Sequence, residues 1–285
     1  MVFIDEFLKN NYSLNQCNAV WDTDKWIIYS SDHVFYLIEV FNIDFVLDCV
    51  HLSSFLSYCN IILYNNQHQL VSIYENSYYV LLQRNNFSFS EIHLNPNFFS
   101  YYCFHYKIPF QWNKLWVQKS DYIEKYYHSI KGKYSIIDES IDYYLGLLEL
   151  SISYISSYSN YDIQAYIVHF SFDEFQYYNP LNLKIDCIER EFAEYLKYLF
   201  FHNLYEKEKI EKLLYQYRNF FNYDFVIARM LFPSYYFLAL ERIVNSNDSY
   251  DEVLSIVSRI DDYREYVYWI IEYISCFCPI KKISF

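Results

Sequence analysis

The spacing of apolar and polar positions changes from a strand pattern to a helix pattern along this chain. In the first hundred or so residues, short runs of aromatic and β-branched side chains alternate with polar turns. Residues 25–30 and 33–41 flank a Ser31-Asp32 turn and predict a hairpin, and a short helix is expected from residue 43 to about 56. Further strands are predicted at 61–64, 69–74 and 78–83.

From about residue 113 the apolar positions recur every three to four residues, as on one face of a helix. The clearest stretch runs from Ile141 to Ile155, and others lie near 192–199, 208–221, 224–244 and 252–275. Pro233 lies inside one of these stretches and is expected to kink or divide it. Short strands are predicted between the helices, at 162–169 and 183–186.

These patterns predict an α+β fold with two parts. Residues 1–95 form a small strand-rich N-terminal lobe, and residues 96–285 form a larger, mainly helical C-terminal lobe. The boundary is placed loosely near residues 85–110, where Asn85-Asn86, Pro96 and Pro109 interrupt the pattern.

The scarcity of glycine excludes several classes of enzyme. The chain has only 2 glycines, Gly132 and Gly146, which lie far apart in the sequence. A P-loop, a GxGxxG fingerprint and the GxSxG elbow of hydrolases all need several glycines at fixed spacing. The sequence therefore excludes P-loop NTPases, ordinary dinucleotide-binding enzymes and the common serine hydrolases.

The net charge and the cysteines indicate which partners the protein can bind and in which cellular compartment it works. A formal net charge of −13 opposes binding to nucleic acid and to anionic membranes, so neither is expected as a partner. The 7 cysteines are scattered and the 8 histidines form no metal-binding motif, which favours the reducing cytoplasm and no structural zinc. The acidic N-terminus does not resemble a signal peptide, and no apolar run is long enough to predict a transmembrane helix.

One polar segment, residues 169–186, stands out between two apolar strands. It runs from a strand through a loop containing Asp173 and Asn182 into a short strand that ends in Asp186. In this order it resembles the catalytic core of aminoglycoside-phosphotransferase-like kinases, particularly their spore-coat-associated branch. In such kinases one loop Asp orients the attacking hydroxyl group, while an Asn and a second Asp hold Mg²⁺.

Three other stretches match that branch in the same order. Residues 115–124 resemble its Trp…Asp…Glu helix, and residues 142–149 resemble its Leu-Gly-x-x-Glu helix. Residues 228–237 are similar to its Arg-x-Leu-x-Pro-x-Tyr-Phe stretch, the most specific of the three. The resemblance covers roughly residues 110–245, and it implies a protein-kinase-like fold with Mg-ATP as the cofactor of active members.

This chain departs from the family pattern at the positions of the catalytic residues. Carried over residue by residue, Asn182 and Asp186 match the metal-holding positions, whereas the base position falls on Tyr177, or on Gln176 after a shift of one. Asp173 and Glu174 are the nearest acids, but they are out of register. The strand that should carry a phosphate-pairing lysine has Ile38 and Glu39 at the expected position, so no basic residue is available there.

Losing the lysine, the base and the glycine-rich loop together removes most of the electrostatics on which phosphoryl transfer depends. The sequence therefore predicts a pseudokinase with a binding or structural role, with an unidentified protein as its partner and a link to sporulation.

Two alternatives stay open. The first is an atypical small-molecule phosphotransferase that uses Asn182 and Asp186 for Mg-ATP and Asp173 as a displaced base. The second is an interaction module of unrelated α+β fold, suggested by the 36 tyrosines, in which the same residues are purely structural.

Overall fold

The structure is a computed structural model that describes residues 2–22, 24–86, 103–246 and 250–281. The chain folds into two compact units. The first contains residues 1–95 and 167–185, and the second contains residues 96–166 and 186–285. The predicted lobe boundary between residues 95 and 96 lies outside the described residues.

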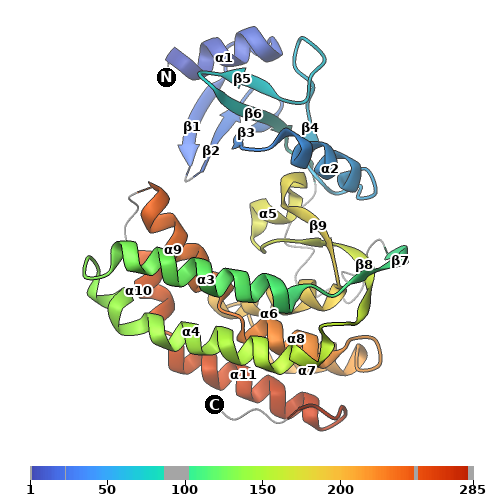
Figure 1. Ribbon diagram of the computed structural model, residues 1–285. Helices are drawn as coiled ribbons and strands as arrows, with labels where there is room; N and C mark the ends of the chain where they lie inside the picture. The colour runs from blue at the N-terminus through green and yellow to red at the C-terminus, as the bar shows by residue number, and fades with distance from the viewer. Residues whose placement is uncertain (1, 23, 87–102, 247–249, 282–285) are drawn as a thin grey trace. The chain divides into compact units, whose positions relative to one another are not determined.

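The first unit is built on an antiparallel sheet with the strand order β1-β2-β3-β6-β4, in which β5 also pairs with β6 (Figure 1). Its strands are β1 (Asn18–Asp22), β2 (Lys25–Tyr29), β3 (Val34–Val40), β4 (Ile61–Ile62), β5 (Ser72–Tyr74) and β6 (Ser77–Gln83). Its helices are α1 (Val2–Tyr12), α2 (Ile43–Ser53), α5 (Glu174–Tyr178) and the 3-10 turn η4 (Pro180–Asn182).

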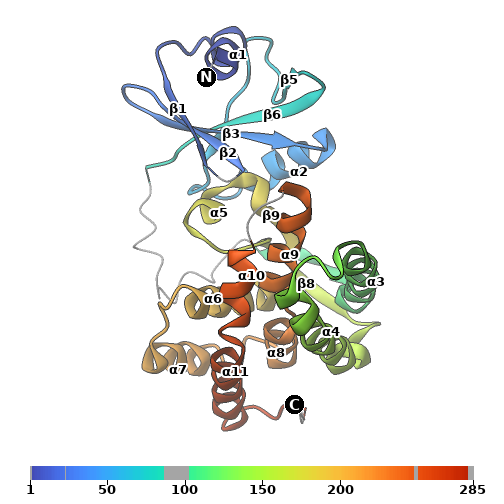
Figure 2. The same ribbon diagram turned by 90° about the vertical axis from the view of Figure 1, so that its left-hand side faces the viewer.

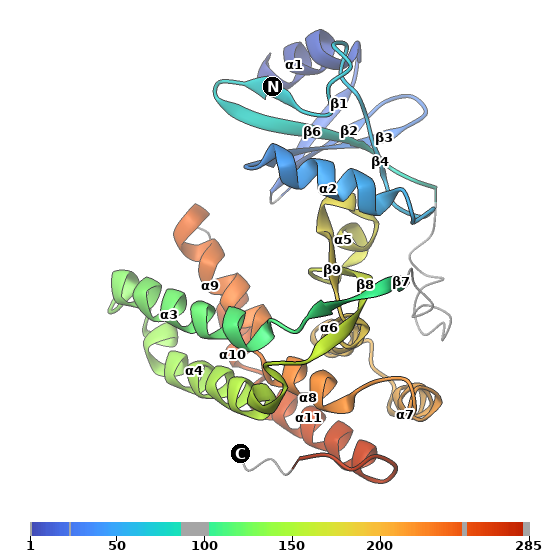
Figure 3. The ribbon, with the colours of Figure 1, turned by 45° about the vertical axis from the view of Figure 1, so that its right-hand side comes forward.

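Two hydrophobic cores lie on opposite faces of this sheet, as the alternation of side chains along a strand requires. On one face Phe35 and Leu37 of β3 pack with Phe7 of α1. On the other face Val40 packs with residues of α2 and with Leu181 of η4. Figure 3 shows α1 and α2 on these opposite faces. The segment 167–185 thus completes the core of the first unit.

The second unit is a set of packed helices. They are α3 (Trp112–Ile130), α4 (Ser135–Ile155) with the 3-10 turn η3 (Ser156–Tyr158), α6 (Ile188–Phe201), α7 (Lys207–Gln216), α8 (Tyr223–Leu231), α9 (Ser234–Ser246), α10 (Asp251–Val257) and α11 (Ile260–Ser275). Helix α8 packs against α4, α6 and α11 (Figure 2). Every side chain of α6 from Ile188 to Phe200 is buried, so this helix forms the centre of the unit.

A three-stranded sheet of β7 (Cys103–Pro109), β8 (Asp162–His169) and β9 (Leu183–Asp186) completes the fold. The chain passes from the second unit to the first within β8, after residue 166, and returns after residue 185, at the end of β9. The predicted strands at 162–169 and 183–186 are confirmed.

Pro233 divides its helix as predicted, because α8 ends at Leu231 and α9 begins at Ser234. The single helix predicted at 252–275 is wrong, since the chain forms α10 and α11 instead. Arg259 lies at this break, and its guanidinium group donates to the carbonyl oxygens of Phe200 and Phe201, both at 2.8 Å. The side chain at this break therefore satisfies carbonyl groups at the end of α6.

None of the helices in the described part of the chain combines the length and the apolar content needed to cross a membrane.

Candidate functional site

A cavity of about 270 Å³ opens on the sheet of the first unit. Its walls come from β1, β2, β3 and α5, and they include the cations Lys25 and Arg84 and the rings of Tyr36 and Phe175. The Tyr36 and Phe175 rings meet edge to face, with their centroids 4.8 Å apart. The cavity thus combines an aromatic lining with charged groups, as ligand sites commonly do.

Lys25 brings its charge into this cavity from β2. In the antiparallel register of β2 and β3, Lys25 lies directly opposite Ile38, where the kinase resemblance calls for a lysine. The expectation that no basic residue is available was therefore too narrow, because the neighbouring strand supplies one. The signal was present in the sequence, since a hairpin turn at Ser31-Asp32 pairs position 38 with position 25.

The Lys25 ammonium group already has partners of opposite charge. Its Nζ lies 3.2 Å from a carboxylate oxygen of Asp22 and 3.4 Å from one of Asp24. It also lies 4.5 Å from the centroid of the Phe175 ring, within range of a cation–π contact. A phosphate group that approached Lys25 would meet these two carboxylates as well.

The position of the predicted catalytic base is occupied by a buried aromatic stack. Tyr177 is 4% exposed, and its ring stacks on Tyr58 at 4.9 Å and on His169 at 4.9 Å. His169 Nε2 also lies 3.1 Å from the carbonyl oxygen of Tyr177. Two of these contacts are ring stacking and the third is a polar contact to the backbone, so the base position holds a packed phenol ring in place of a carboxylate.

Asn182 holds the loop that leads to β9. Its Oδ1 accepts from the backbone N–H of Ser171 at 3.1 Å and from the hydroxyl group of that residue at 3.3 Å. Its Nδ2 donates to the carbonyl oxygens of Ser171 at 2.8 Å and Gln176 at 2.9 Å. The whole amide is therefore used to fasten residues 171–182.

Asp173, the candidate for a displaced base, caps helix α5. Its Oδ1 accepts from the backbone N–H of Gln176 at 2.7 Å, which is the usual N-cap bond to the third residue of a helix. This contact explains the residue structurally, and its role as a base stays a prediction.

Asp186 lies at the end of β9, in the second unit, and accepts hydrogen bonds from a tryptophan side chain and from the backbone. The indole Nε1 of Trp112 lies 3.0 Å and 3.2 Å from the two carboxylate oxygens, and the backbone N–H of Cys187 donates to Oδ1 at 2.9 Å. The amide of Asn182 and the carboxylate of Asp186 are thus each engaged by protein donors. Their role as metal ligands stays a prediction.

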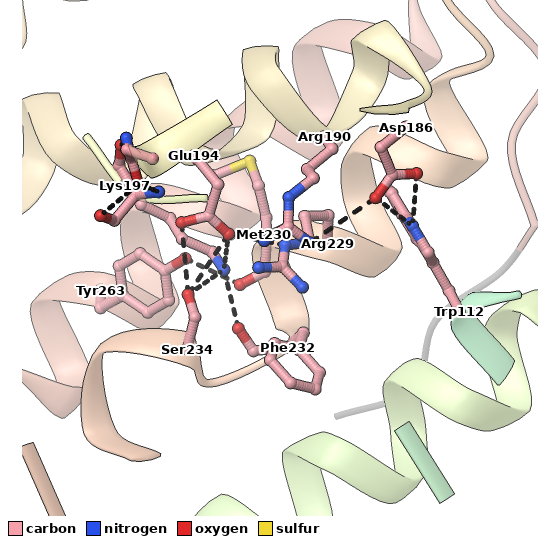
Figure 4. Close-up of polar contacts among 12 residues, drawn as sticks. Trp112, Asp186, Arg190, Glu194, Lys197, Arg229, Met230, Phe232, Ser234 and Tyr263 are labelled. Carbon is pink, nitrogen blue, oxygen red and sulfur yellow. Dashed lines mark hydrogen bonds and ion pairs between the residues drawn. The ribbon is translucent and has the colours of Figure 1, made fainter. Parts of the chain in front are cut away.

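Beyond Asp186 a chain of buried charges runs along α6 (Figure 4). Arg190 lies 3.8 Å from Asp186, while Glu194 contacts both Arg229 at 2.6 Å and Lys197 at 3.3 Å. All five charged residues are buried. Sequence reasoning missed this cluster, because these charges fall at spacings that a solvated helix face would also show.

Burial and charge act in opposite directions on the pKa values of this cluster. Burial alone would raise the pKa of Glu194, but the positive charges of Arg229, Lys197 and Arg190 outweigh it and hold the pKa at about 2. Burial lowers the pKa of Lys197 to about 7, although the carboxylate of Glu194 raises it in part. The cluster thus keeps the Glu194 carboxylate ionised, while Lys197 loses its charge as the pH rises through about 7.

Among the residues that the structure describes, no three His, Cys, Asp or Glu side chains gather into a group that could hold a metal ion. The seven cysteines all lie in described parts of the chain, and none forms a disulfide.

Solved structures of aminoglycoside phosphotransferases share this fold. The enzyme from Alicyclobacillus acidocaldarius subsp. acidocaldarius DSM 446 is 8% identical and aligns over 94% of this chain and 95% of its own, with a TM-score of 0.52. A thermostable mutant of APH(4)-Ia, in a ternary complex with AMP-PNP and hygromycin B, is 10% identical over 93% of this chain and 99% of its own, with a TM-score of 0.55. At such identities the likeness shows the fold alone.

None of the curated proteins matches the chain. Residues 5–265, most of its length, match the family described as "Spore coat putative kinase YutH". The predicted α+β kinase-like fold and the predicted resemblance are both confirmed, and the alternative of an unrelated fold is wrong. The chain therefore belongs to this spore coat family of kinase-like proteins.

Proposed function

We propose that the protein is a pseudokinase, a kinase-fold protein without phosphotransfer activity that has a binding or structural role connected with the spore coat. The observation that carries the proposal is the stack around Tyr177. The position of the base holds a buried tyrosine ring that stacks on Tyr58 and on His169, where a kinase needs a carboxylate to take a proton from the attacking hydroxyl group.

The engagement of the metal-holding positions supports the same proposal. Mg²⁺ needs several oxygen ligands in near-octahedral geometry. The oxygen of Asn182 accepts two hydrogen bonds from Ser171, and the carboxylate of Asp186 accepts from the Trp112 indole. These donors already use part of the acceptor capacity that a metal would need from the two side chains.

The test is calorimetry of ATP binding with and without Mg²⁺, together with an ATP turnover assay on the same protein. We expect no Mg²⁺-dependent binding at millimolar ATP and no turnover. An active aminoglycoside phosphotransferase, measured in parallel, controls for the assay. Mg²⁺-dependent binding and turnover that both disappear in Asp186→Ala would overturn the proposal.

A second candidate function, an atypical small-molecule phosphotransferase, is favoured by one observation, the placement of Lys25. A lysine opposite Ile38 could pair with phosphate from β2, with Asn182 and Asp186 on Mg²⁺ and Asp173 as the base. This candidate predicts turnover that Lys25→Met abolishes and that Lys9→Met, at an exposed lysine of the same unit, leaves unchanged.

We further propose that the protein works in the cytoplasm and binds neither nucleic acid nor membrane. The seven thiols outside disulfides and the net charge of −13 support this proposal.

A further inference from the structure

Strand β1 is an edge of the sheet in the first unit, and its outer side offers backbone groups for pairing. It lies at the end of the strand order, beside β2 (Figure 1). Its side chains are largely exposed, including Val20 at 49% and Trp21 at 54%. An exposed edge strand is a template on which another strand can pair.

The register fixes which backbone groups point outward. The Ser30 N–H donates to the carbonyl oxygen of His33 at 2.9 Å, so the even-numbered residues of β2 bond to β3 and its odd-numbered residues bond to β1. Ile27 opposes Val20, so residues 18, 20 and 22 bond to β2. Ala19 and Trp21 therefore direct their N–H and C=O groups away from the sheet. Within the described residues, neither makes a further backbone hydrogen bond.

Asp22 is the only charged residue of β1, so the strand has little of the charge that commonly protects an edge. Edge strands are commonly guarded by a proline, a lysine or a bulge. The five residues of β1, Asn-Ala-Val-Trp-Asp, contain neither proline nor lysine, and their register with β2 is continuous.

We propose that β1 pairs antiparallel with β1 of a second copy of this chain, in the register that places Val20 on the two-fold axis. In that register Trp21 lies opposite Ala19 of the second copy, and Asp22 lies opposite Asn18 of the second copy. A large ring meets a small side chain, a carboxylate meets an amide that can donate to it, and like charges do not face each other.

The same register also satisfies the outward backbone groups. Ala19 and Trp21 of one copy exchange hydrogen bonds with Trp21 and Ala19 of the other, which gives four bonds across the axis. Shifting the register by two residues in either direction would pair only three residues of each strand and would leave one outward residue of each strand in the overlap, which gives two bonds. The length of β1 therefore favours the register centred on Val20.

The interface is small and the copies repel each other. One short strand pair buries far less than the ~1,200 Å² of a stable protein–protein interface, so the dimer should be weak. Each copy carries a net charge of −13, and added salt screens this repulsion. Self-association should therefore strengthen as ionic strength rises.

Sedimentation equilibrium of the full chain tests this dimer. We expect the average mass to rise from 35.1 kDa toward twice that value with concentration, and to rise further in higher salt. Val20→Lys should weaken association at least tenfold, because it sets two lysines against each other at the axis. Ile73→Lys is the matched control, since it makes the same charge change at a side chain that is 63% exposed on β5, and it should associate as the wild type does.

A second variant removes a bond without adding charge. Ala19→Pro deletes an outward N–H, and an edge strand tolerates proline where that N–H faces solvent. Circular dichroism and the melting temperature would show that the variant is folded. Three results would each overturn the proposal. The wild type could stay monomeric at both salt concentrations, or Val20→Lys and Ile73→Lys could associate equally. The third is a folded Ala19→Pro variant that still dimerises. The inference goes beyond the proposed function, because it does not depend on whether the protein transfers phosphate.

Discussion

Removing the carboxylate of Glu194 should destabilise the protein far more than removing an exposed glutamate does. Its side chain is 3% exposed and takes hydrogen bonds from Arg229 at 2.6 Å and Lys197 at 3.3 Å. In Glu194→Ala the polar ends of Arg229 and Lys197 would stay buried without this carboxylate between them. Breaking one partner out of a buried ionic network typically costs about 3–5 kcal/mol of folding free energy.

The chain offers a matched control for this prediction. Glu206 and Lys209 form the same type of pair, three residues apart, but their side chains are 58% and 47% exposed. Exposed pairs of this kind are worth about 0–1 kcal/mol, so Glu206→Ala should be close to neutral. Urea unfolding of both variants, followed by circular dichroism, measures the difference directly.

Equal losses in the two variants would refute the reasoning, because they would mean that the buried network does not stabilise the helical unit. A loss in Glu194→Ala that is largely recovered in the double variant Glu194→Ala, Lys197→Met would support it. The recovery follows because the second change removes one of the cations left without its carboxylate partner.

Three further predictions concern pH, the loop and the thiols. Burial lowers the pKa of Lys197 from 10.5 to about 7, so above this pH the unfolded chain binds a proton that the folded chain does not. Stability from this group should therefore rise between about pH 7 and pH 9, and urea midpoints of Lys197→Met should lack that rise. Asn182→Ala should cost about 1–3 kcal/mol in urea unfolding, because it removes the amide that donates to the part-buried carbonyl groups of Ser171 and Gln176. Burial raises the pKa of Cys59 to about 12, so it should react with a thiol reagent only after denaturation, whereas the exposed Cys103 should react in the folded protein. A folded protein in which both thiols react at the same rate would contradict this last expectation.

The local sequence pattern predicts most of the fold because it reflects local physics. The hairpin at 25–30 and 33–41 forms β2 and β3, since its turn residues and alternating apolar positions specify the same register. Strands β8 and β9 have the predicted bounds, 162–169 and 183–186. The resemblance over residues 110–245 likewise carries fold information, because it depends on the order of motifs along the chain.

Prediction from the sequence fails for elements whose packing partners lie far away along the chain. Helix α1 was missed because the first hundred residues were expected to form mainly strands, yet Ile4, Phe7 and Leu8 share one helical face and cover the sheet. Strands β1 and β7 were also not predicted, and both lie at a sheet edge where one face need not be buried. Edge strands carry a weaker alternation of apolar and polar residues, so their sequence signal is weaker.

At the candidate site, too, the sequence predicts the residue type at each position but not its distant contacts. The absence of a carboxylate at Tyr177 could be predicted, because a residue type at a known position is local information. The stack that replaces it joins Tyr58 to residues more than a hundred positions later, and only the folded first unit brings them together. Lys25 could have been found from the hairpin register, whereas its carboxylate partners depend on side-chain placement.

Polar residues have therefore not disappeared from this kinase fold; they make structural contacts. Asn182 fastens a loop, Asp173 caps a helix and Asp186 accepts from an indole, so each makes hydrogen bonds within the protein. A catalytic site needs the opposite arrangement, in which polar groups are held by their neighbours but aimed at a substrate that is absent until it binds. A selection for stability alone would retain each of these contacts. This difference is why engagement of the predicted site residues, more than their identity, favours the pseudokinase.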